Sequence, residues 1–153
     1  MNLAVDKCRA SGVAVVSVVN SHHFGAAGCY AKIAADRGVI GMVTSSTRGV
    51  TMVPTFRGGA HHGHQSLAFA APAKRNPPFS LDMATTTVAA GKVKVYKLNH
   101  KPLPAGWTVD GNGQTVTDAE EAFRYVFERA EGGITPLGGA RARWAATRAT
   151  ASR

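Results

Sequence analysis

Two adjacent histidines, His22 and His23, lie where an apolar run gives way to glycine. Five of the seven residues 13–19 are valine, and Gly25 and Gly28 follow the histidines closely. Imidazole is the side chain that gains and loses a proton near neutral pH, which suits general acid/base catalysis. A second use of such a pair is orientation or packing, which is the more ordinary interpretation for His22.

The elements around this pair predict an α/β arrangement. The valine run is typical of a strand buried on both faces, a helix is expected over 26–37 with Gly38 at its end, and a second strand over 39–43. Such a βαβ unit brings its parallel strands to one sheet edge, where ligands bind and where free N–H groups of the helix start favour an anion. The histidines are expected at that edge.

This unit lacks the fingerprint of the Rossmann dinucleotide-binding fold. GxGxxG is absent, and the second strand ends in the hydroxyl run 44–47 where that fold has an acidic residue for the ribose. A nucleotide bound here must therefore meet hydroxyl groups, unless the run is an ordinary polar loop. Asp82 lies inside an apolar strand expected over 79–84, where a carboxylate needs either a structural partner or a function.

Other segments complete the expected elements. Helices are predicted over 2–10, ended by Gly12, and after Thr117, with Glu120 closing a capping box. Strands are predicted over 67–71 and, from the alternation of lysine with apolar residues, over 92–98. Residues 110–113 carry the turn chemistry of a hairpin.

Composition argues against several classes of protein. The 153 residues carry a net charge of +9, but Arg141, Arg143, Arg148 and Arg153 supply four of these charges, and the rest are not interleaved with aromatics. This argues against nucleic-acid binding. No apolar run has the ~20 residues of a membrane span. His61, His62 and His64 have no Cys, Asp or Glu beside them, so no metal site is predicted.

A set of motifs in order along residues 1–141 carries a resemblance. They are NSHHFGAAGCYA (20–31), RGVIG (37–41), LAFAAP (67–72), LDMATT (81–86), GKV (91–93), KPLPAGWTVDGNG (101–113) and EGGITPLGG (131–139). Together they resemble the malate/L-lactate dehydrogenase family, which includes ureidoglycolate dehydrogenase and Δ1-piperideine-2-carboxylate reductase. The resemblance implies an α/β fold with a mixed sheet, flanking helices and a non-Rossmann NAD(P)-binding domain.

The resemblance also implies the chemistry. His23 would be the proton donor and acceptor, Thr47 would contact the cofactor, and Asp82, Met83 and Ala84 would line the nicotinamide. Family members reduce a 2-oxo acid or a cyclic imine with NADH or NADPH and oxidise a 2-hydroxy acid in reverse. A cytoplasmic homodimer is expected for the full-length enzyme, with a small-molecule substrate and neither nucleic acid nor membrane as partner.

The chain departs from the family at its ends. The family has an active-site Ser-His segment upstream of Met1, and Gly-Ser-His-Lys-Gly-Tyr-Gly, with a cofactor-binding lysine, after residue 139. Codons chosen for 142–153, ARWAATRATASR, encode that segment when read in another frame. We therefore expect 1–141 to be the NAD(P)-binding domain of a truncated enzyme and 142–153 a non-native or disordered tail. The alternative is a non-catalytic remnant that still binds the nucleotide.

Overall fold

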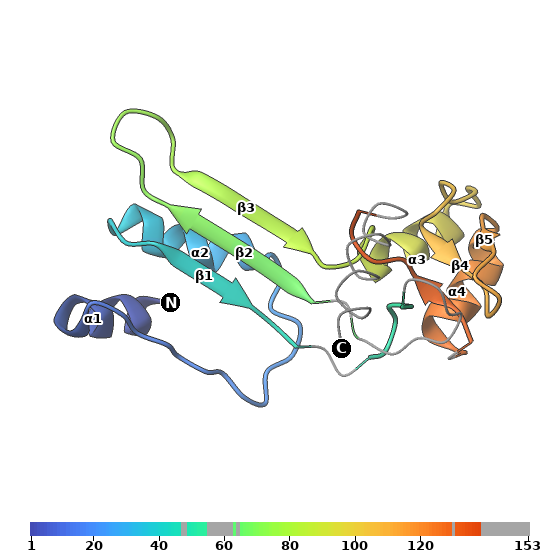
Figure 1. Ribbon diagram of the computed structural model, residues 1–153, viewed down its shortest axis with the longest axis horizontal. Helices are drawn as coiled ribbons and strands as arrows, with labels where there is room; N and C mark the ends of the chain where they lie inside the picture. The colour runs from blue at the N-terminus through green and yellow to red at the C-terminus, as the bar shows by residue number, and fades with distance from the viewer. Residues whose placement is uncertain (47–48, 55–62, 64, 130, 139–153) are drawn as a thin grey trace, which may run out of the picture. The chain divides into compact units, whose positions relative to one another are not determined.

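The computed structural model describes residues 1–46, 49–54, 63, 65–129 and 131–138. The chain divides into two compact units, each described here by itself (Figure 1). Unit 1 consists of Met1–Ser45 and Ser66–Met83, and unit 2 of Ser46–Gln65 and Ala84–Arg153. In the described part of the chain, no helix is long and apolar enough to cross a membrane.

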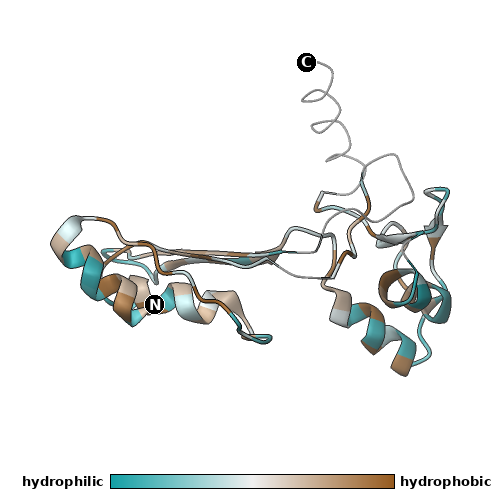
Figure 2. Ribbon diagram, turned by 90° about the horizontal axis from the view of Figure 1, so that it is seen from below, coloured by the Kyte–Doolittle hydropathy of each residue, from teal (hydrophilic) through white to brown (hydrophobic). Residues whose placement is uncertain are grey.

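Unit 1 is a three-stranded sheet with a helix against one face (Figure 2). The sheet has the order β1-β2-β3, formed by Gly41–Thr44, Ser66–Ala71 and Phe79–Ala84, and β1 pairs antiparallel with β2. The covering helix is α2, Ala27–Asp36. The predicted strands at 67–71 and 79–84 and the predicted helix at 26–37 are thus confirmed.

The contact between α2 and the sheet is made of very small residues. Its buried members are all alanine, with Phe24 and Val43 packed beside them: Ala27, Ala31, Ala35, Ala68 and Ala70. A Cβ added at Gly41 would lie 2.6 Å from the backbone oxygen of Ala31, so the strand and the helix approach each other backbone to backbone. This close approach fixes α2, and with it the segment just before α2, against the sheet.

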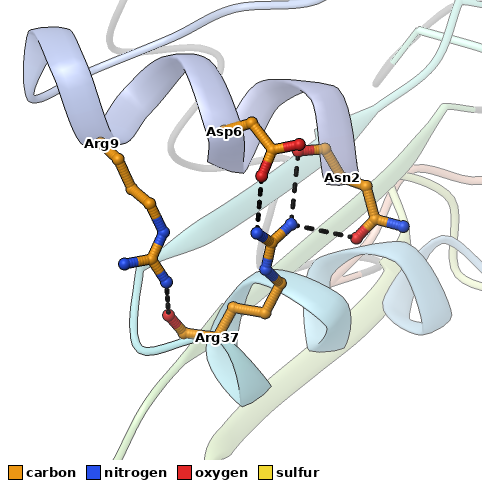
Figure 3. Close-up of polar contacts among 4 residues, drawn as sticks. All are labelled: Asn2, Asp6, Arg9 and Arg37. Carbon is orange, nitrogen blue, oxygen red and sulfur yellow. Dashed lines mark hydrogen bonds and ion pairs between the residues drawn. The ribbon is translucent and has the colours of Figure 1, made fainter.

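The first helix, α1, spans Asn2–Ser11 and ends at Gly12 with φ 79°, as predicted. Val5 is its buried residue. Figure 3 shows how polar contacts join it to the end of α2: an Arg37 guanidinium nitrogen lies 2.6 Å from Asp6 Oδ1, and Arg9 donates to the Arg37 carbonyl at 3.2 Å. Exposed charge pairs of this kind contribute little free energy each.

The predicted buried strand at 13–19 is wrong. These residues form no strand, and the valines are exposed, from 37% for Val16 to 90% for Val15. Within the described residues β1 is hydrogen-bonded to β2 and not to this run, so the parallel βαβ pairing is wrong as well. β-branched residues favour a strand only where a neighbouring strand receives their backbone groups.

Unit 2 combines a small sheet with two helices. The sheet has the order β5-β4-β6, formed by Thr115–Val116, Thr108–Val109 and Gly133–Ile134, with antiparallel pairing of β4 to both neighbours. The helices are α3, Ala90–Leu98, and α4, Ala119–Phe127. The core they share is formed by larger residues than in unit 1: Val88, Ala90, Val93, Leu103, Val116, Ala119, Ala122, Val126 and Ile134.

Two elements of unit 2, a turn and a helix, were predicted from residues within or next to them. The turn at 110–113 is confirmed, with Asp110 Oδ1 accepting from the N–H groups of Asn112 and Gln114 at 2.9 and 2.8 Å. The helix predicted after Thr117 is also confirmed. Its N-cap, however, is the next residue, Asp118, whose Oδ1 accepts from the Glu121 N–H at 2.8 Å.

The predicted half-exposed strand at 92–98 is wrong, since this segment lies in α3. Ala90, Val93 and Tyr96 are three residues apart and are the ones that pack into the core, which is a helical period. Val95 is 52% exposed, although alternation would have placed it beside Val93. A short run in which lysine alternates with apolar residues fits the strand period of two as well as the helical period. Here the packing of Ala90, Val93 and Tyr96 into the core of unit 2 favours the helix.

Candidate functional site

The residues that follow the valine run include a short segment, His23 to Ala26, that leads into α2. The His23 side chain is exposed, and its Nδ1 accepts a hydrogen bond from the Gly25 N–H at 3.1 Å. Gly25 has φ 80°, a left-handed conformation that favours glycine. Because Nδ1 acts as an acceptor, the neutral ring carries its hydrogen on Nε2. Nε2 is thus the nitrogen that remains for a ligand.

Phe24 anchors this segment to the unit. Its ring packs against the alanine core and lies 5.6 Å from the ring of Tyr30, centroid to centroid. The Tyr30 hydroxyl donates to the Phe24 carbonyl at 2.9 Å. The residue next to His23 is therefore held both by its side chain and by its backbone. Neither contact follows from a local sequence signal, and Tyr30 was not among the predicted site residues.

Asp82 reaches the start of α2 from β3. Its Oδ2 accepts a hydrogen bond from the Gly28 N–H at 2.8 Å. The N-cap of α2 is Ala26, which has no side chain able to cap the helix, so Asp82 supplies the missing acceptor from the neighbouring strand. The expectation that a carboxylate in this strand needs a partner is confirmed, and the partner is a helix N-terminus.

Gly28 permits this contact. A Cβ at position 28 would lie 2.9 Å from Asp82 Oδ2 and 3.0 Å from Asp82 Cβ, so the carboxylate and the helix meet only because position 28 has no side chain. The predicted anion site at the start of α2 is accordingly wrong at this N–H group. The Gly28 N–H is already occupied by a carboxylate, whose negative charge disfavours a phosphate beside it.

The other predicted cofactor residues lie around the end of β3. Met83 and Ala84 are its last residues, and both are half-buried. Thr47 lies outside the described residues, as do His61, His62 and His64. Among the residues that are described, no group of three or more His, Cys, Asp or Glu side chains could hold a metal ion.

Comparison with known proteins identifies the family. The family model described as malate/L-lactate dehydrogenase matches residues 1–146. The chain belongs to the malate/L-lactate dehydrogenase family. The match covers His23, Asp82 and all of unit 1, and it extends through unit 2 as far as residue 146.

Relatives in this family carry related names. The chain is 40% identical over 141 residues to malate dehydrogenase of Pyrococcus abyssi, covering 91% of this chain and 36% of that protein. It is 31% identical over 138 residues to (2R)-3-sulfolactate dehydrogenase (NADP(+)) of Chromohalobacter salexigens, covering 90% of this chain and 39% of that protein. The chain thus spans somewhat more than a third of the length of these relatives.

A solved structure confirms the fold class. The crystal structure of malate dehydrogenase from Entamoeba histolytica superposes with a TM-score of 0.82 at 29% identity, over 91% of this chain and 38% of that one. The fold is therefore the α/β fold of the malate/L-lactate dehydrogenases, as the motifs implied. The differences from expectation are the segments at 13–19 and 92–98 and the parallel pairing of the first two predicted strands.

Proposed function

We propose that this chain is the cofactor-binding portion of an NAD(P)-dependent oxidoreductase that interconverts a 2-oxo acid and a 2-hydroxy acid of the malate or L-lactate class. Family membership and relatives named as dehydrogenases of hydroxy acids support this reaction type. One relative has NADP(+) in its name, which supports a nicotinamide cofactor. We propose His23 as the residue that exchanges a proton with the substrate oxygen.

The observation that carries this proposal is the state of the His23 ring. The ring is exposed, its Nδ1 is held by the Gly25 N–H, and its Nε2 is left for a substrate oxygen. Hydride addition to a carbonyl leaves an alkoxide that must receive a proton, and a protonated His23 ring, with a hydrogen on each nitrogen, can supply it from Nε2. In the reverse direction Nε2 would take the proton from the hydroxyl group, in the neutral ring form that carries its hydrogen on Nδ1 and has given up the Gly25 bond.

The residues at the end of β3 fit a nicotinamide nucleotide. Among the described residues, Asp82 Oδ1 has no hydrogen-bond partner, so it can accept one from a ribose hydroxyl or a carboxamide. Met83 and Ala84 offer half-buried apolar surface beside it. The negative charge of Asp82 disfavours a phosphate here, so we assign these residues to the nicotinamide end of the cofactor, away from its phosphates. When bound, the cofactor would supply the hydride, and the protein would orient it and manage the proton.

Two measurements on the purified chain test this function. Fluorescence titrations with NADH and with NADPH should show saturable binding, weakened by Asp82→Ala. Turnover assays with oxaloacetate and pyruvate follow oxidation of the bound cofactor, and any turnover that this partial chain shows should be lost in His23→Gln and retained in the matched control His22→Gln. Binding without turnover would instead support a non-catalytic nucleotide-binding remnant, and the absence of binding would refute both interpretations.

A further inference from the structure

A single peptide group connects Tyr30 with His23. The group between Phe24 and Gly25 has its carbonyl oxygen bonded to the Tyr30 hydroxyl at 2.9 Å and its N–H bonded to His23 Nδ1 at 3.1 Å. No cis peptide bond occurs in the described residues, so this group is trans and its C=O and N–H point in opposite directions. Fixing the carbonyl therefore fixes the direction of the N–H.

The anchors of this peptide are independent of His23. Tyr30 lies on α2, and the first turn of that helix is joined to β3 through Gly28 and Asp82. The Phe24 ring packs into the alanine core and against the Tyr30 ring. The peptide is thus held by the helix and the core, whereas the exposed imidazole is held by the peptide. Hydrogen bonds in such a chain also polarise one another, so that donation from Tyr30 strengthens the Gly25 N–H as a donor.

We propose that Tyr30 is a positioning residue for His23, which acts through the Phe24–Gly25 peptide to hold the neutral ring in its Nε2–H form. This inference rests on the proposed function, which it deepens. It makes neutral His23 a hydrogen-bond donor toward the carbonyl oxygen of a 2-oxo acid before hydride arrives. An Nδ1–H ring could not keep the Gly25 bond, because two N–H groups would then face each other.

The test reads the ring nitrogens directly and needs no turnover. In the full chain with 15N-labelled histidine, at alkaline pH where imidazoles are neutral, ring NMR spectra distinguish a protonated nitrogen from one with a lone pair. His22 is the internal reference, because in the described part of the chain its exposed ring makes no hydrogen bond. We expect the ratio of Nε2–H to Nδ1–H to be higher for His23 than for His22.

Two matched variants complete the experiment. Tyr30→Phe removes only the hydroxyl and should lower the His23 ratio toward that of His22, by roughly three- to tenfold, the effect of one hydrogen bond. Tyr96→Phe is the control, since in the described residues the Tyr96 hydroxyl makes no hydrogen bond and its ring packs against Trp107 in unit 2. Circular dichroism of both variants should match that of the wild type.

The results separate this inference from the proposed function. If the His23 ratio equals the His22 ratio in the wild type, or is unchanged by Tyr30→Phe, the positioning role is refuted even where NADH binds. If the ratio shifts as expected but neither nicotinamide cofactor binds, the positioning role stands as geometry and the proposed function fails.

Discussion

Two glycines at equivalent helix positions give opposite predictions for the same substitution. Gly28 and Gly91 each occupy the second position of a helix, α2 and α3 respectively. A Cβ at Gly28 would lie 2.9 Å from Asp82 Oδ2, whereas a Cβ at Gly91 would meet nothing within 4 Å. Gly91→Ala should therefore stabilise the chain by up to about 1 kcal/mol, the difference in helix propensity.

Gly28→Ala has the same gain in helix propensity, but its contact with Asp82 makes it destabilising overall. Overpacking against Asp82 costs about 1–3 kcal/mol, and losing the hydrogen bond to this exposed carboxylate costs about 1 kcal/mol more. The net effect is a loss of about 1–3 kcal/mol, so the two variants should differ by about 2–4 kcal/mol. The sign of the difference depends on the contact between helix and strand and not on helix propensity.

Native-state hydrogen exchange can measure both effects, because it reports the two helices separately. The free energy of opening should fall for α2 amides in Gly28→Ala and rise for α3 amides in Gly91→Ala. In an Asp82→Ala background the Gly28→Ala loss should shrink without vanishing, since the contact with Cβ at 3.0 Å remains. Equal stabilisation by both alanines would refute the argued role of Gly28.

Three further predictions follow from single contacts. Val15→Ser should change the free energy of unfolding by less than about 0.5 kcal/mol in urea, because the side chain is 90% exposed. A loss of several kcal/mol would instead support a buried strand at 13–19. Gly41→Ala should cost about 1–3 kcal/mol in thermal unfolding, since its Cβ would lie 2.6 Å from a backbone oxygen of α2, and an unchanged Tm would contradict this. Asp118→Ala should cost about 1 kcal/mol, seen as faster exchange of α4 amides, and unchanged α4 protection would rule out the cap.

The elements that were predictable carry their signals locally. The ends of α1 and α2 follow from glycines at 12 and 38, both with φ 79°. The turn at 110–113 follows from Asp110, whose carboxylate accepts hydrogen bonds from two nearby backbone N–H groups. In each case the residues that decide the structure lie within a few positions of it.

The two wrong segments depend instead on distant neighbours. The run at 13–19 has strand composition, but within the described residues β1 pairs with β2 and not with this run. The segment at 92–98 has strand-like alternation, but the packing of Val93 and Tyr96 requires a helix. Composition cannot decide either case, because secondary structure follows the tertiary contact when local preference is weak.

The site shows the same division. The pair His22 and His23 could be singled out from its residue type and from the glycines that follow it, and the family resemblance selected His23 within the pair. The partner of Asp82 could not, because 54 residues separate it from Gly28 and the contact depends on how closely α2 approaches β3. The connection between Tyr30 and His23 could not be predicted from the sequence either. It runs through the peptide group between Phe24 and Gly25, and a peptide group gives no sequence signal.

The alanine interface under α2 has a consequence for the order in which the chain opens. Alanine removes little apolar area from water, so the buried residues of unit 1 contribute less free energy than the valine, leucine and isoleucine core of unit 2. The amides of unit 1 should therefore exchange with solvent at a lower opening free energy. Unit 1, which carries His23, should therefore open before unit 2. A ligand that binds only the closed form of unit 1 would make this opening less frequent by mass action.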